Sequence, residues 1–412
     1  MTPRRTRAGG ARKRPARYDP EEPHPPLREA LRAHKRGDLA AATERYREAL
    51  RARPGSLDAL ANLGAALALR GRVREASEAL DHALRAGWSA PRVARDVGMS
   101  LASLGLYPRA RAAFARALEL DASLVGALLA WSRACGEDGD PDEALAHAER
   151  AAALAPDDPS AWVELHRATL RDEDPERALQ AAARAVGLDP QAALPRVLVA
   201  GAELRDGGSL RTPLDGLPEG LRAAVAWAAA HPAPCFGYKR EALAHALDQA
   251  PREGEVIEMG VRLGVSARVL AARTTRAVHG FDSFEGLPTA WRGLPAGAFS
   301  MEGIAPPLPA NVTLHVGRFE EALPPFASRL AGPPALVHVD SDLYESARVS
   351  LDALGPRLAP GSVLLFDEYL GNEHWRDDEH RAFTECAARF GWRWEALSRS
   401  LVTGQVALRL RA

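Results

Sequence analysis

Small and apolar residues recur at a fixed interval through the first half of the chain. Glycine stands at four positions that are each 34 residues apart: Gly37, Gly71, Gly105 and Gly139. The same step links two sets of alanines, which are Ala42, Ala76, Ala110, Ala144 and Ala178, and Ala49, Ala83, Ala117, Ala151 and Ala185. A third register holds Tyr46, Leu80, Phe114, Ala148 and Ala182, and a fourth holds Pro54, Pro156 and Pro190. Each unit is predicted to form two amphipathic helices around a turn that contains glycine.

This period, with small residues at the helix crossings and proline closing the unit, resembles the tetratricopeptide repeat. The match covers about five units, from Leu27 to about Ala193. Such units cannot bury their apolar faces alone, so we expect an α-helical solenoid with a concave surface. The resemblance implies that this surface binds a protein or peptide partner. A spacer or an oligomerisation surface is the alternative, and the pattern leaves both open.

The second half carries a different pattern, in which short apolar runs end in acidic residues. The acids that follow four such runs are Glu258, Asp282, Asp340 and the pair Asp367 and Glu368. Continuous apolar runs of this length are typical of strands buried on both faces of a parallel sheet. Ligands of open α/β sheets bind beyond the carboxyl ends of the strands. The sequence therefore predicts a chemical centre at the strand exits.

A glycine turn follows the first of these strands and leads into a helix that begins near Ser266. Gly260 and Gly264 lie in the turn, and Asp282 follows 22 residues after Gly260. Taken alone, this spacing also describes a dinucleotide site. Three features favour a different ligand: the third close-packing glycine is missing, Glu258 would suit an ammonium or sulfonium better than a pyrophosphate, and later strand exits cluster carboxylates.

Charge and composition narrow the possible partners and the cellular compartment. The 53 basic and 54 acidic residues nearly cancel, which disfavours nucleic acid as a partner. No apolar run is long enough to span a membrane, and three cysteines without metal-like spacing fit a reducing, cytoplasmic compartment. Residues 1–26 are rich in arginine and are predicted to be a disordered basic tail, with a nucleic-acid-binding arm as the alternative. We expect the repeat array at 27–205, a linker and capping helix at 206–235, and the sheet domain at 236–412.

Four motifs in the second half resemble the macrocin-type O-methyltransferases, the TylF/MycF group of class I S-adenosylmethionine-dependent enzymes. In order they are Glu258-Met-Gly-Val-Arg-Leu-Gly-Val-Ser266, Phe281-Asp-Ser-Phe-Glu-Gly-Leu-Pro288, His338-Val-Asp-Ser-Asp-Leu-Tyr-Glu-Ser346 and Pro360-Gly-Ser-Val-Leu-Leu-Phe-Asp-Glu-Tyr369. The resemblance implies a Rossmann-like fold with a mostly parallel seven-stranded sheet. It runs from about Phe236 to the C-terminus.

The resemblance also implies a role for each matching residue. The methionine end of the cofactor would be held by Glu258, Gly260, Gly264 and Ser266, the ribose by Asp282, and the adenine by the turn that contains Phe319. Magnesium would be held by Asp340, Asp367 and Glu368. Asp340 or His374 would accept the proton of the substrate hydroxyl. The family usually has aspartate where this chain has Glu368, so that side chain could instead cap its strand or pair with Arg348 or Arg376.

The prediction is therefore an S-adenosylmethionine-dependent, magnesium-assisted O-methyltransferase fused to a repeat array. A sugar or glycosylated small molecule leads the acceptor classes, and residues 289–309 are expected to form an acceptor-facing lid. Asp342 and Glu345 are interpreted as residues that begin the following helix. The competing hypothesis is an adaptor whose repeats bind a partner and whose sheet domain is inactive. The sequence leaves open whether the protein forms a homo-oligomer.

Overall fold

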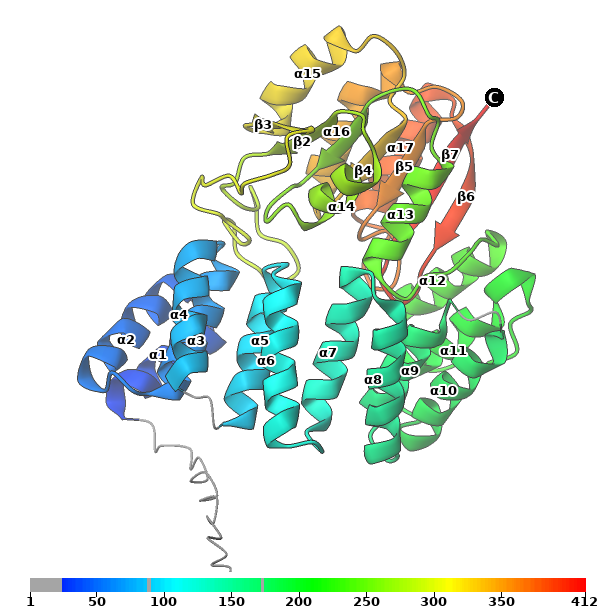
Figure 1. The fold of residues 1–412 in the computed structure, drawn as a ribbon. Helices are drawn as coiled ribbons and strands as arrows, with labels where there is room; N and C mark the ends of the chain where they lie inside the picture. The colour runs from blue at the N-terminus through cyan, green and yellow to red at the C-terminus, as the bar shows by residue number, and fades with distance from the viewer. Residues whose placement is uncertain (1–23, 87–89, 172–173) are drawn as a thin grey trace, which may run out of the picture.

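The computed structural model describes residues 24–86, 90–171 and 174–412, so the predicted tail lies outside it up to residue 23. The part described first is an array of helices in antiparallel pairs (Figure 1). Its helices are α1 Pro25–Lys35, α2 Leu39–Ala52, α3 Leu57–Leu69, α4 Val73–Ala86, α5 Pro91–Ser103, α6 Tyr107–Leu120, α7 Val125–Asp138, α8 Pro141–Leu154, α9 Pro159–Thr169, α10 Pro175–Leu188 and α11 Ala193–Glu203. We call α1 to α11 the array.

The 34-residue pattern has a direct structural cause. The alanines of the two alanine registers are fully buried where helices cross, and Tyr46, Leu80 and Phe114 fill the gaps beside them. The four periodic glycines have φ between 68° and 94°, a conformation that glycine adopts at little cost, and each stands in the turn between the two helices of a pair. The predicted helical solenoid is therefore confirmed.

A seven-stranded sheet follows, in the order β3-β2-β1-β4-β5-β7-β6. Strands β1 to β5 are parallel neighbours, and β7 runs antiparallel to both β5 and β6. The strands are β1 Val256–Met259, β2 Val278–Asp282, β3 Val312–Val316, β4 Leu336–Val339, β5 Val363–Phe366, β6 Arg393–Arg399 and β7 Val406–Arg411. The predicted mostly parallel sheet of seven strands is confirmed.

Helices cover both faces of this sheet. They are α13 Lys239–Gln249, α14 Val265–Arg273, α15 Phe319–Arg329, α16 Tyr344–Leu354 and α17 Glu379–Phe390, and α12 Glu219–Ala230 precedes them. Side chains of β1, β4 and β5 alternate between the two faces. One set packs on α15, α16 and α17 and the other on α13 and α14, so these three strands are buried throughout. We call α13 to β7 the sheet domain.

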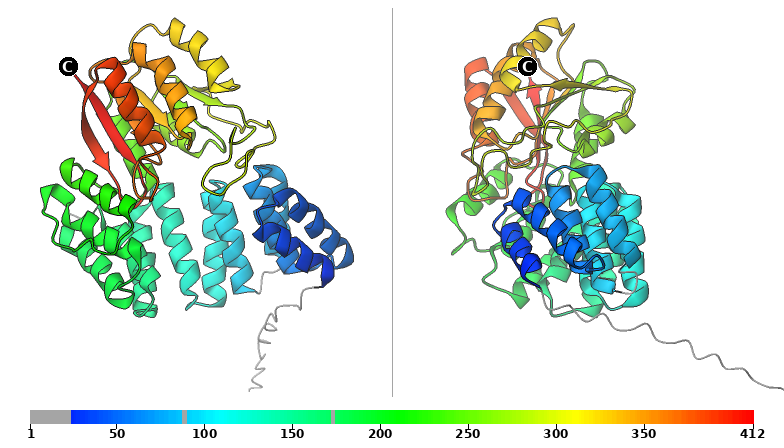
Figure 2. Two further views of the ribbon diagram at one scale, coloured as in Figure 1. Left: turned by 180° about the vertical axis from the view of Figure 1, so that it is seen from behind. Right: turned by 90° about the vertical axis from the view of Figure 1, so that its left-hand side faces the viewer.

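The sheet domain sits on the array with its strand exits facing the repeats. In Figure 1 the arrowhead of β6, which runs in the same direction as β5, points at the array. The two further views agree that the array lies along this edge (Figure 2). One apolar cluster runs from the cores of the first repeats into Val261, Phe284 and Met301 of the sheet domain. The array therefore packs directly on the region where parallel sheets bind ligands.

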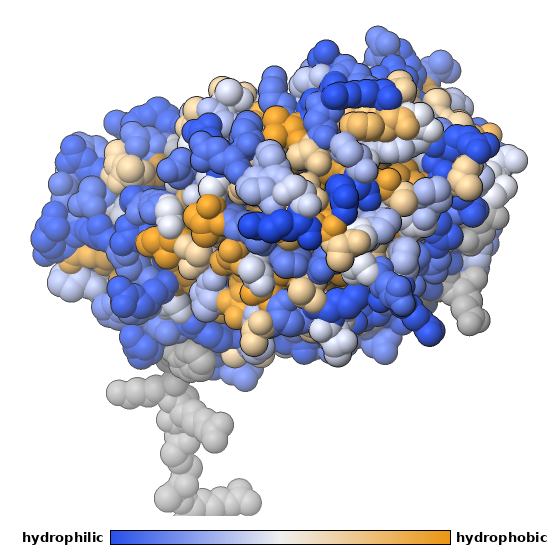
Figure 3. All heavy atoms as spheres, turned by 90° about the horizontal axis from the view of Figure 1, so that it is seen from above, coloured by the Kyte–Doolittle hydropathy of each residue, from blue (hydrophilic) through white to orange (hydrophobic). Residues whose placement is uncertain are grey.

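The opposite face of the sheet domain is different. Seen from above, it is a mosaic in which hydrophilic residues predominate and apolar residues form scattered patches (Figure 3). Among the described residues, no helix is long and apolar enough to cross a membrane.

Candidate active site

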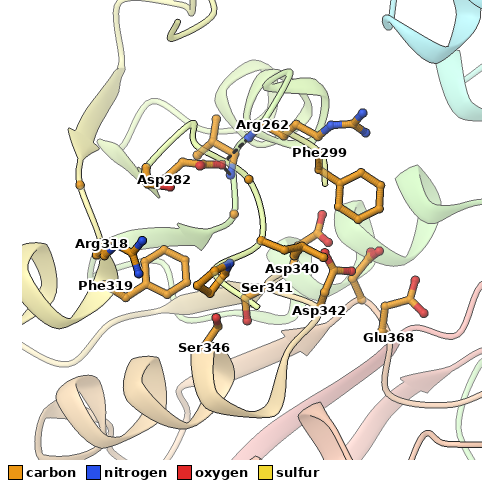
Figure 4. A pocket seen from close by; sticks show the side chains of 18 of the residues that line it. Arg262, Asp282, Phe299, Arg318, Phe319, Asp340, Ser341, Asp342, Ser346 and Glu368 are labelled. Carbon is orange, nitrogen blue, oxygen red and sulfur yellow. Dashed lines mark hydrogen bonds between the residues drawn. The ribbon is translucent and has the colours of Figure 1, made fainter. Parts of the chain in front are cut away.

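A cavity of about 370 Å³ opens at the carboxyl ends of β1, β2, β4 and β5. Its lining joins the predicted strand exits to the loops around them, and Figure 4 shows Asp282, Arg318 and Phe319 on one side and Asp340, Asp342 and Glu368 on the other. This is the edge at which ligands of open α/β sheets bind.

The glycine turn and Asp282 form one unit on the cavity wall. One oxygen of the Asp282 carboxylate accepts the backbone N–H groups of Val261 and Arg262 at 2.9 and 2.7 Å, and the other accepts that of Phe284 at 2.7 Å. Gly260 has φ 92°, and an added Cβ would lie 1.8 Å from the carbonyl oxygen of Asp340. Only glycine allows this close approach of two strand exits. Three of the about four acceptor sites of this carboxylate are therefore in use, which leaves one on Oδ1 for a ligand in the cavity that Asp282 lines.

The turn that was predicted to border an adenine lies on the cavity wall. Gly317, Arg318, Phe319 and Glu320 line the cavity where β3 leads into α15, and Phe319 is the first residue of that helix. The buried hydroxyl of Ser341, which also lines the cavity, has no hydrogen-bond partner among the described residues.

An ammonium group stands among the predicted metal ligands. Lys239, at the start of α13, forms an ion pair and hydrogen bond with the Oδ2 atom of Asp367, and its Nζ lies 3.8 Å from Oε1 of Glu368. Burial opposes its charge, yet the nearby carboxylates of Asp367 and Asp340 raise the pKa of Lys239 above its ordinary value. The sequence reasoning missed this residue. The available signal was that Lys239 is the only lysine in the second half of the chain.

The donors in this arrangement do not fit an additional Mg²⁺. Both oxygens of Asp367 already accept hydrogen bonds, from Lys239 and from Nε2 of Gln405 at 2.6 Å. A possible donor set is His338, Asp340 and Asp367, whose ligand atoms lie within 4.8 Å of one another. His338 cannot ligate while it is protonated. Mg²⁺ requires near-ideal octahedral oxygen geometry. The Lys239 ammonium already pairs with Asp367 and lies near Glu368, so these two carboxylates are arranged around an ammonium instead.

Glu258 is placed differently from the expectation. It is fully buried and lines neither cavity; its Oε1 atom lies 3.1 Å from Nδ1 of His338, its register partner on β4. Burial would lower the pKa of His338, but hydrogen bonding and charge from Asp367 and Glu258 raise it to about 10. The pair is therefore a buried ion pair beneath the site, and Glu258 supports the site through His338.

The structure does not bring His374 to the site. Its side chain is 68% exposed and lies 3.8 Å from Asp377, on the connection between β5 and α17. Asp342 also departs from its interpretation, because the N-cap of α16 is Leu343 and no side chain caps that helix. Instead Asp342 has φ 60° and lines the cavity, and burial raises its pKa to about 7. Strained non-glycine backbone of this kind often marks functional positions.

Residues 289–309, which we call the lid segment, border both the cavity and the array. Phe299 lines the cavity, and the Arg262 guanidinium lies 4.9 Å from the centre of its ring. Arg292 approaches Glu368 at 3.5 Å and Asp378 at 2.7 Å. Glu368 thus lies near Lys239 and Arg292, whereas the sequence predicted a metal ligand, with Arg348 or Arg376 as alternative partners.

The lid segment is anchored to the second repeat. The carboxylate of Glu302 accepts hydrogen bonds from Arg70 and Arg72, both at 2.5 Å. Met301 is buried against Gly71, where a Cβ would collide with the methionine side chain.

Comparisons with known proteins agree with this division of the chain. Residues 257–369 match the family model of a methyltransferase domain, and three models of the tetratricopeptide repeat match residues 33–95, 70–125 and 125–168. The chain therefore carries tetratricopeptide repeats in its N-terminal half and a methyltransferase domain in its C-terminal half.

One curated relative is 8-demethyl-8-(2,3-dimethoxy-alpha-L-rhamnosyl)-tetracenomycin-C 4'-O-methyltransferase of Streptomyces olivaceus. It is 34% identical over 143 residues, which is 28% of this chain and 53% of the relative. The chain thus spans about half the length of the curated relative that it matches.

Solved structures with similar parts include two methyltransferases and one repeat protein. The O-methyltransferase NovP is 21% identical with 42% of this chain and 80% of that chain covered, at a TM-score of 0.33. The calicheamicin methyltransferase CalS11 is 20% identical with 57% and 93% covered, at 0.32. YrrB, described as a TPR protein with an unusual peptide-binding site, is 22% identical with 44% and 92% covered, at 0.35. At these TM-scores the likenesses carry no conclusion about this chain.

Proposed function

We propose that the protein is an S-adenosylmethionine-dependent O-methyltransferase that acts on a hydroxyl of a sugar or another small-molecule or glycan acceptor. The observation that carries the proposal is the joining of two features in one cavity: a glycine turn braced by Asp282, and a lysine held among carboxylates. The methyltransferase match and the O-methyltransferase name of the curated relative support it. We also propose the domain limits 27–205, 206–235 and 236–412.

Bound S-adenosylmethionine supplies an electrophilic methyl group on a sulfonium. Gly260 lets the exits of β1 and β4 approach each other, and the remaining acceptor site of Asp282 can accept a ribose hydroxyl. Phe319 and the turn before it form the wall for the adenine. These residues bind and orient, and the array and the lid segment exclude water from the strand exits.

The acceptor hydroxyl must lose its proton as its oxygen attacks the methyl group. Lys239 can donate a hydrogen bond to that oxygen, which stabilises negative charge as it develops. We assign the proton to Asp340, because it lines the same cavity as Lys239 and the glycine turn. This chemistry requires no divalent metal, so magnesium is not included in the proposed mechanism.

The repeats imply a protein or peptide partner. Part of the array is occupied by the sheet domain, so we propose that a partner binds the remaining array surface. The competing hypothesis of an inactive adaptor predicts that the sheet domain binds no cofactor.

The proposal is tested by calorimetry with S-adenosylhomocysteine and by transfer of a labelled methyl group to a panel of sugars and glycosylated small molecules. Asp340→Asn should abolish transfer while S-adenosylhomocysteine still binds through Asp282 and the glycine turn, with an affinity no more than about tenfold weaker than in wild type. Asp352→Asn, on the surface of α16, is the matched control and should leave both unchanged. Absence of cofactor binding by the wild-type protein would refute the proposal and favour the adaptor.

A further inference from the structure

A second cavity, of about 300 Å³, lies between the sheet domain and the array. It shares Lys239, Asp340 and Asp367 with the first cavity, so the two meet at the acidic cluster. The repeats contribute Ala102, Ser103, Tyr107 and Glu137 to its wall. A ligand that extends through this meeting point would contact both the sheet domain and the array.

Another part of the wall is the beginning of α14. Val265 and Ser266, the first two residues of that helix, line the cavity. The turn at Gly105 packs so closely on Val265 that a Cβ there would lie 2.9 Å from it. Backbone N–H groups at a helix start favour a carboxylate, and the Ser266 hydroxyl adds a donor.

The interior of the cavity also holds polar atoms that lack partners. Oε1 of Gln405 has no hydrogen-bond partner among the described residues, and Nε2 of His338 has only the Asp367 carboxylate at 3.8 Å; the two side chains are 2% and 1% exposed. Both residues line the cavity. Buried polar atoms are normally satisfied by protein, water or ligand, so these two indicate that the cavity accommodates a polar occupant.

The array also holds the helix that carries Lys239. The carboxylate of Glu137, near the end of α7, accepts the backbone N–H groups of Lys239 and Arg240 at 3.3 and 3.4 Å. It thereby caps the start of α13 from another domain. The Cβ position of Gly139 lies 2.7 Å from the Arg240 side chain, which leaves little freedom at this junction.

We propose that the second cavity receives the amino-acid end of the cofactor and that Ser103 and Tyr107 of the array form one wall of that subsite. The α-carboxylate would lie at the start of α14, and the α-ammonium would face Asp340, where the two cavities meet. A zwitterion fits because the cavity offers helix N–H donors on one side and carboxylates on another. The inference rests on the proposed function. It makes the array part of the cofactor site as well as a partner-binding module.

The test uses the full-length protein and two ligands that differ in the amino-acid part. S-adenosylhomocysteine contains it, and 5′-methylthioadenosine ends at the methylated sulfur. Ser103→Trp fills the cavity from the array side. Ser100→Trp, one turn earlier on the same helix and absent from the cavity lining, is the matched control.

Calorimetry should give an affinity for S-adenosylhomocysteine that falls by about tenfold or more in Ser103→Trp, with 5′-methylthioadenosine within about twofold of wild type. Tyr107→Phe should shift the affinity in the same direction by a smaller factor, and Ser100→Trp should change neither ligand. Unchanged S-adenosylhomocysteine affinity in Ser103→Trp, or an equal loss for both ligands, would overturn the inference while the proposed function stands. A wild-type protein that binds neither ligand would overturn both.

Discussion

The buried ion pair of His338 and Glu258 beneath the cavity can be tested by stability measurements, which do not depend on activity. The two side chains are 1% and 0% exposed, and their closest atoms are 3.1 Å apart. His338→Leu keeps an apolar volume at the position and leaves the Glu258 carboxylate buried without its partner. Removal of one partner of a buried ion pair is strongly destabilising, because the remaining charge is no longer compensated.

The expected cost in free energy of unfolding is about 3–5 kcal/mol. Hydrogen bonds to Asp367 and Glu258 raise the pKa of His338 to about 10 despite its burial, so the imidazole carries the charge that compensates Glu258. The second variant is Glu258→Met combined with His338→Leu, which replaces the whole pair by apolar side chains. Such replacements are often neutral, so the double variant should be more stable than His338→Leu alone.

The assay is urea unfolding followed by circular dichroism, with each single variant, the double variant and wild type forming a double-mutant cycle. His279→Leu on β2 is the matched control, because His279 lies 3.3 Å from the partly exposed Glu255 and its loss should cost no more than about 1 kcal/mol. If His338→Leu costs as little as the control, or if the two single costs add in the double variant, the pair is not the buried ion pair described above.

Three other predictions concern the cation cluster, the lid segment and the array. Lys239→Met should lower turnover by about a hundredfold or more. It should also free the carboxylates to bind Mg²⁺, so calorimetry should detect Mg²⁺ binding in the variant and not in wild type. Loss of wild-type turnover in EDTA would contradict this prediction. Glu302→Gln should change the free energy of unfolding by no more than about 1 kcal/mol but should speed proteolytic cleavage of the lid segment. The control Glu285→Gln should leave the cleavage rate unchanged. Equal cleavage rates in Glu302→Gln and wild type would show that Glu302 does not anchor the lid segment. Burial lowers the pKa of His166 to about 4, so protonation favours the unfolded chain and stability falls as pH drops from 6.5 towards 4. Between pH 7 and 5 the free energy of unfolding, measured by urea denaturation, should therefore fall by about 2 kcal/mol less in His166→Gln than in wild type. Parallel pH profiles of the two proteins would refute this.

Local pattern predicted the elements of both halves well, because their burial is periodic. The 34-residue step follows from repeats that contact only their neighbours, so each unit must carry the same small residues at the same crossings. The apolar runs of β1, β4 and β5 reflect burial on both sheet faces, and the strand exits of Asp282, Asp340 and Asp367 line one cavity.

The direction of individual side chains was harder to predict. Glu258 was expected to face the ligand, but β4 lies beside β1 in a register that places His338 directly opposite it. Strand order is not encoded in any single strand, so this pair was not visible in the pattern. Asp342 was interpreted as a helix-start residue because its position in the sequence is typical of one, and the φ of 60° that turns it to the cavity is a product of the surrounding packing.

The strand-exit acids were therefore determined by the sequence itself, since alternation and apolar run length are local properties of the chain. The residues that pair with these acids and hold them in place were decided by the tertiary structure alone. Lys239 reaches Asp367 across 128 residues, and Glu137 caps the helix of Lys239 from a repeat 102 residues earlier. The second of these contacts exists because the array docks on the strand exits of the sheet. That docking depends on the shapes of two folded units and leaves no periodic trace in the chain.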